Sequence, residues 1–149
     1  MTSASWTTAL SESTEEVLEK MFFTCPFEDD GSGDNDSASG FAARVAFRGS
    51  PSGALAVNLS TTAARSLASN FFGLEPEELT DKQVTEVVGE LANMLCGSLL
   101  SHPECEGRFE LSSPELAPAE AAKPAPLVCT YNLGDGILKI GLELDEPAH

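Results

Sequence analysis

Basic residues are scarce in this sequence. It has eight Lys and Arg against 24 Asp and Glu among 149 residues, a formal net charge of −16. Nucleic-acid-binding proteins need clusters of Lys and Arg to displace counterions from phosphates, and anionic membrane surfaces attract the same residues. The composition therefore argues against both kinds of partner.

Long apolar segments are also missing. No run approaches the ~20 apolar residues of a membrane-spanning helix. The opening residues, MTSASWTTAL, lack the basic and then apolar order of a secretory signal. Hydrophobic residues nevertheless make up 42% of the chain, which is enough for a packed core. We expect a single cytoplasmic domain spanning residues 1–149.

The four cysteines, Cys25, Cys96, Cys105 and Cys129, form no C-x-x-C pair. Cys96 lies in an apolar helical pattern, where a reduced cysteine acts as a small hydrophobic residue. Cys96, His102 and Cys105 lack the spacing of a zinc site and a fourth ligand. A chain of this size does not need a disulfide framework. We expect neither a metal site nor disulfides.

One stretch, TDKQVTEVVGELANMLCGSLLS from Thr80 to Ser101, predicts a long helix. Thr80 and Gln83 have the spacing of a capping box, in which each side chain satisfies a backbone donor of the first turn. Apolar residues then recur at steps of three and four, which indicates one buried face. They are Val84, Val87, Val88, Leu91, Met94, Leu95 and Leu99.

A second stripe of this helix is polar. It consists of Glu86, Glu90, Asn93 and Gly97, at steps of four, three and four. Lys82 can pair with Glu86, but no basic residue lies three or four positions from Glu90. Gly89 and Gly97 each weaken a helix by about 1 kcal/mol relative to Ala, which suggests that something approaches the backbone closely. The stripe is either a solvated helix face or a binding site.

Two further helices are predicted. Apolar spacing indicates the first from about Thr7 to Phe23, ended by Pro26. Its glutamates are interpreted as a solvated face. The second begins at a cap formed by Ser60 or Thr61 and stops at Gly73. Its aromatic pair, Phe71 and Phe72, is expected in the core.

Alternating patterns predict strands over residues 41–47 and 54–59, which form a hairpin. A possible strand spans 107–112, and a closing hairpin joins 127–133 to 136–144. The predicted class is α+β, with two long helices packed on an antiparallel-rich sheet.

Two segments are predicted to lack regular structure. Residues 28–40, EDDGSGDNDSASG, are too acidic and too poor in large apolar side chains to offset the entropy of ordering, so we expect a mobile loop. Calcium binding by its aspartates is the alternative, but the register and closing Glu of a calcium loop are absent. Residues 114–126, PELAPAEAAKPAP, are Ala- and Pro-rich and are expected to form a linker.

The segment GELANMLCG, with Glu86 four positions before Glu90, resembles the E-x-x-N signature helix of the CheC/CheX family. Members of this family are phosphatases that act on the aspartyl phosphate of response regulators such as CheY. The similarity is closest to the CheX branch. LSESTEEVLEKMFF resembles the first helix of that branch, and SGALAVNLSTTAARSLASNFFG resembles its strand and second helix. The resemblance covers roughly the first 110 residues.

This resemblance implies a CheX-like fold, a homodimer and roles for the polar stripe. Asn93 would place the attacking water, and Glu90 would form a salt bridge with a lysine of the receiver domain. The divalent metal would come from the receiver, so the chain would need no cofactor of its own. Glu86, Gly89 and Gly97 are expected to contact the partner.

Two positions depart from the family pattern. Glu19 stands in the first helix where two-site members have Asn, which implies one site per chain. Glu86 stands where Asp or Ser is common, so its exact role is not assigned. The pathway that the resemblance implies is chemotaxis or another form of two-component signalling. A module that binds a receiver without hydrolysis and a metal-dependent hydrolase that uses the acidic loop are the alternatives.

Overall fold

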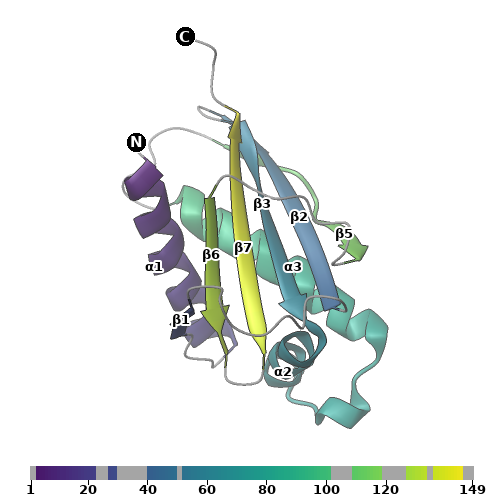
Figure 1. Cartoon of the computed structure of the whole chain (residues 1–149). Helices are drawn as coiled ribbons and strands as arrows, with labels where there is room; N and C mark the ends of the chain where they lie inside the picture. Colours follow the sequence, from purple (N-terminus) through teal and green to yellow (C-terminus); the bar gives the residue numbers. More distant parts are fainter. Residues whose placement is uncertain are drawn as a thin grey trace.

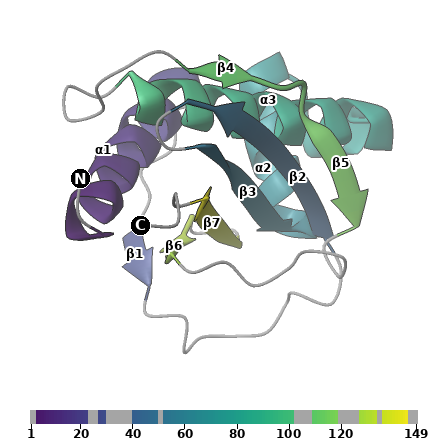
Figure 2. The same ribbon diagram turned by 90° about the horizontal axis from the view of Figure 1, so that it is seen from above.

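Helices and an antiparallel sheet form two layers in the computed structural model (Figures 1 and 2). The structure describes residues 3–22, 27–29, 40–49, 52–101, 109–118, 127–133 and 136–145. The helices are α1 (Ser3–Met21), α2 (Thr61–Phe72) and α3 (Asp81–Leu100), with a short 3-10 helix, η2 (Pro76–Glu78). The strands are β1 (Phe27–Asp29), β2 (Gly40–Arg48), β3 (Ser52–Ser60), β4 (Glu110–Leu111), β5 (Glu115–Pro118), β6 (Leu127–Asn132) and β7 (Ile137–Asp145).

All the strand pairs are antiparallel, and the sheet has the order β1-β6-β7-β3-β2-β4, with β5 also paired to β2. The hairpins β2–β3 and β6–β7 confirm the two predicted from alternation. The α+β class, with α1 and α3 laid against the sheet, is confirmed as well (Figure 2).

The core lies between the three α-helices and the inner face of the sheet, and one face of α3 is buried in it. Its buried side chains include Val84, Val87, Val88, Leu91, Leu95 and Leu99. Met94, predicted on the same face, is only partly buried. Helix α1 starts earlier than predicted, because Trp6 is also buried, one turn before the buried Leu10.

The predicted start and end of α2 and the predicted start of α3 are confirmed. Thr80 Oγ1 accepts a hydrogen bond from Gln83 N at 3.1 Å, and Gln83 Oε1 accepts one from Thr80 N at 2.9 Å, so the capping box of α3 is complete. Ser60 caps α2, and Gly73 ends it with a positive φ of 70°.

Ser60 also joins three elements. Its Oγ accepts hydrogen bonds from Ala63 N in α2 at 3.4 Å and from Ile137 N in β7 at 3.1 Å. A Cβ at Gly136 would collide with this same Oγ, so the residue before β7 has to be glycine. These contacts fix the start of α2 against the sheet.

Both segments expected to lack structure contain strand residues. Four residues of the expected linker, 115–118, form β5, and their register places Glu115 opposite Arg44 and Pro118 opposite Phe41. An edge strand needs only main-chain pairing on one side, so Ala and Pro are tolerated there. In the expected acidic loop, Glu28 and Asp29 belong to β1, and Gly40 begins β2. Residues 30–39 and 119–126 lie outside the described part of the chain.

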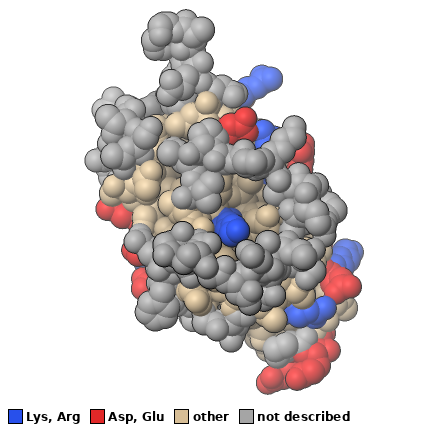
Figure 3. All heavy atoms as spheres, viewed as in Figure 1, with Lys and Arg blue, Asp and Glu red and all other residues tan. Residues whose placement is uncertain are grey.

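Acidic side chains are spread over the surface. On the face seen in Figure 3, those of the described residues lie mainly around the margin rather than in one patch. None of the described helices combines the length and the apolar character needed to cross a membrane.

Candidate functional site

Helix α3 carries the predicted polar stripe along its length, and its opposite face is packed in the core. Glu86 and Glu90 are exposed, whereas Asn93 and Gly97 are half-buried. We call these four residues the α3 ridge. Because one rigid helix holds all of them, their spacing is fixed by helix geometry.

The two carboxylates of the ridge have no ion pair with a described residue. The ion pairs within the described ranges are Lys20–Glu16, Arg44–Glu143 and Arg65–Asp81. The possible pair Lys82–Glu86 is not among them. Glu86 and Glu90 are like charges one helical turn apart, an arrangement that weakens an isolated helix slightly. A cation from a partner would offset that repulsion.

The Asn93 side chain is the uncharged polar side chain of the α3 ridge. It is half-buried on α3, and its amide makes no hydrogen bond with any residue of the described ranges. An asparagine amide offers two donor hydrogens and an acceptor oxygen without carrying charge. It can therefore hold a water beside an anionic group.

The two glycines of α3 differ. Gly89 is buried, whereas Gly97 is half-buried, and a Cβ built on Gly97 would meet no atom within 4 Å. The sequence suggested that another group approaches the helix backbone at Gly97, but the described structure places none there. The helix surface is instead open at Gly97, one turn after Asn93.

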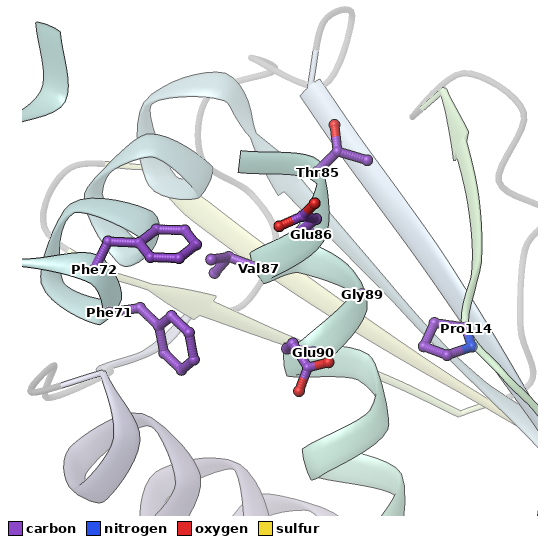
Figure 4. A pocket seen from close by; sticks show the side chains of 8 residues that line it. All are labelled: Phe71, Phe72, Thr85, Glu86, Val87, Gly89, Glu90 and Pro114. Atoms are coloured by element: carbon purple, nitrogen blue, oxygen red, sulfur yellow. The ribbon is translucent and has the colours of Figure 1, made fainter. Parts of the chain in front are cut away.

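A hollow of about 370 Å³ lies beside the first half of the ridge. Phe71 and Phe72 of α2 lie on one side of it and Pro114 lies on the other, with Glu86 and Glu90 of α3 between them (Figure 4). Thr85, Val87 and Gly89 complete the lining.

The prediction that Phe71 and Phe72 belong to the core is wrong in part. Their side chains are 37% and 38% exposed. Both residues lie in the last turn of α2, beyond its buried residues, the last of which is Ala68. Their position just before Gly73 was the available signal in the sequence.

The described residues contain no group of three or more His, Cys, Asp or Glu side chains that could hold a metal ion. Cys96 is fully buried in the core, and burial raises the pKa of its thiol to about 12. Neither Cys96 nor Cys129 forms a disulfide within the described residues. His102, Cys105 and most of the acidic loop lie outside the described ranges.

A family model described as "Chemotaxis phosphatase CheX" matches residues 41–124, a range that includes the whole α3 ridge. Among curated protein sequences, none matches this chain.

Solved structures of CheX proteins share the fold. CheX from Vibrio vulnificus aligns with a TM-score of 0.76 at 15% identity, covering 94% of this chain and 96% of that one. CheX from Desulfovibrio desulfuricans aligns with a TM-score of 0.74 at 17% identity, covering 95% and 99%. CheX in a CheX–CheY–BeF3–Mg complex from Borrelia burgdorferi aligns with a TM-score of 0.73 at 18% identity, covering 95% and 98%.

Proposed function

The chain belongs to the CheX family of chemotaxis phosphatases, and we propose that it hydrolyses the aspartyl phosphate of a CheY-like receiver domain. The observation that carries the proposal is the Asn93 amide, which is held on a rigid helix one turn after Glu90 and bonded to no described residue. The complex of a relative with CheY, BeF3 and Mg supports a receiver as the partner.

The reaction requires little covalent chemistry from this chain. Hydrolysis of an acyl phosphate requires a water in line with the phosphorus–oxygen bond and stabilisation of the charge on the phosphoryl oxygens. The receiver would supply the divalent metal and a lysine. Asn93 would hold the water, because an uncharged amide is not repelled by the phosphoryl group.

Glu90 would act in docking. Its exposed carboxylate would form a salt bridge with the receiver lysine and so position Asn93 over the phosphoryl group. Glu86 would add a second negative charge for the same partner. A homodimer remains a prediction of the family resemblance, and a cytoplasmic location remains a prediction from the composition.

The test is phosphate release from phosphorylated receivers with wild-type protein, Asn93→Ala and Asn93→Asp. Removing one preorganised polar group typically costs about 10² in kcat, and we expect at least this loss for Asn93→Ala. Asn93→Asp keeps the side-chain volume but adds a negative charge beside the phosphoryl group, so we expect a similar loss.

Circular dichroism and thermal melting would establish that both variants are folded. Wild-type activity in a folded Asn93→Ala protein would refute the assignment. If the wild type bound receivers without accelerating phosphate release from any of them, the chain would instead be a recognition module.

A further inference from the structure

The hollow beside the α3 ridge combines an acidic side with an aromatic side. Glu86 and Glu90 provide two exposed carboxylates with no ion pair in the described ranges. Phe71 and Phe72 provide the aromatic side, which we call the aromatic wall (Figure 4). Both sides face a space large enough for protein side chains.

Unlike a typical exposed side chain, the wall is held in place. The Phe71 ring stacks on the fully buried Phe22 ring, with centroids 5.5 Å apart, and meets the Phe72 ring edge to face at 5.4 Å. Because these side chains are already held in place, binding a partner would cost little conformational entropy for ordering them.

The backbone beneath the wall is also fixed. The Ser69 carbonyl accepts hydrogen bonds from Gly73 N at 2.9 Å and from Leu74 N at 3.2 Å, which closes the last turn of α2. The wall is thus a preformed apolar surface next to two carboxylates that form no ion pair within the described part of the chain.

We propose that the aromatic wall is the apolar anchor of receiver binding, and that the hollow takes a lysine- or arginine-bearing segment of the receiver. Long basic side chains combine an apolar stem with a charged head. The stem would cover Phe72, while the head would meet Glu86 or Glu90. A cation near an aromatic face gains a further electrostatic attraction.

The charges favour this occupant over a second copy of the chain. A surface whose two carboxylates have no ion pair with a described residue fits a basic segment, whereas this chain has eight basic residues and a net charge of −16. The hollow is also continuous with the α3 ridge, because Glu86 and Glu90 belong to both. This inference rests on the proposed function for the identity of the partner.

Phe72 is the residue to change, because Phe71 stacks on the buried Phe22 and its loss would disturb the core. We would measure the Kd for a receiver loaded with BeF3 and Mg, together with KM and kcat for phosphate release. Truncating an aromatic anchor commonly weakens binding by about tenfold or more. We expect Phe72→Ala to raise Kd and KM by that factor and to leave kcat unchanged.

Phe72→Leu is the matched control. Leucine keeps an apolar surface against a basic stem, so we expect most of the affinity to be retained. Asn93→Ala provides the opposite pattern, with reduced kcat and nearly unchanged Kd. Thermal melting checks that each variant is folded.

An unchanged Kd for Phe72→Ala, with receiver binding by the wild type intact, would overturn the inference and leave the phosphatase proposal standing. Conversely, receiver binding that depends on Phe72 without any phosphate release would support the inference and refute the phosphatase proposal. If Phe72→Ala shifted the protein from dimer to monomer in sedimentation at an unchanged Kd, a second copy would be the occupant, and the inference would be wrong.

Discussion

Glu90 is an exposed carboxylate whose neighbours within the described ranges leave it without an ion pair. An exposed carboxylate of this kind has little effect on the free energy of unfolding of the unbound protein, because water solvates it. When a partner displaces that water, the charge must be matched, so its effect falls on binding more than on folding.

We therefore expect Glu90→Gln to weaken receiver binding by about tenfold while leaving thermal stability nearly unchanged. Isothermal titration with a receiver loaded with BeF3 and Mg would measure the Kd. Glu19→Gln is the control, because it removes the same charge from the exposed surface of α1, on a different helix. Equal affinities for wild type and Glu90→Gln would show that Glu90 forms no salt bridge with the receiver.

The ridge residues could be predicted because helix spacing is a local property. The steps between Glu86, Glu90 and Asn93 place their side chains together wherever α3 packs. The aromatic wall could not be predicted in the same way. Whether Phe72 is covered depends on what packs beyond the end of α2, and that is decided by residues distant in sequence.

The capping box of α3 is a local device with a measurable contribution. Thr80 Oγ1 accepts from Gln83 N, which satisfies a donor that the helix itself leaves unpaired. We expect Thr80→Ala to destabilise the fold by about 1 kcal/mol. For a chain of this length, that corresponds to a fall in Tm of about 2–4 °C.

Thr80→Ser keeps the accepting hydroxyl and should retain most of the stability. Both variants should retain the wild-type kcat at 25 °C, because the ridge begins more than one turn after the cap. Thermal melting followed by circular dichroism would measure the difference. A Tm for Thr80→Ala equal to that of the wild type would mean that water replaces the cap without loss.

Features that depend on residues close in sequence were predicted correctly, whereas features that depend on residues far apart were missed. The caps at Ser60 and Thr80 and the stop at Gly73 depend on a few neighbouring residues, and all were predicted correctly. Strand β5 was missed, because it forms through pairing with the β2 edge, more than 60 residues earlier in the chain. Composition alone could not reveal that partner. The start of α1 was missed because Trp6 lies before the run of residues that shows the periodicity most clearly.

The net charge of −16 acts on the whole molecule. Like charges at this density repel one another in the compact state, and only three ion pairs offset them within the described ranges. Salt shortens the reach of this repulsion, to about 10 Å at 0.1 M ionic strength.

We therefore expect the Tm to rise by about 2–4 °C when NaCl is increased from about 0.02 to about 0.3 M at neutral pH, which corresponds to roughly 1 kcal/mol. Differential scanning calorimetry at several salt concentrations would measure it. Choline chloride at the same ionic strength serves as the control, since screening depends on ionic strength and not on which cation is present. A Tm that fell with salt would show that attractive pairs outweigh the repulsion.

Helix α3 presents the ridge on one side and buried core residues on the other. Its backbone can open only when the core opens, so amide hydrogen exchange at Asn93 should be as slow as global unfolding allows. The site is therefore formed whenever the protein is folded, and it needs no ordering step before it binds a partner. A destabilising substitution elsewhere in the core would lower the number of competent molecules and leave the affinity of each remaining one unchanged.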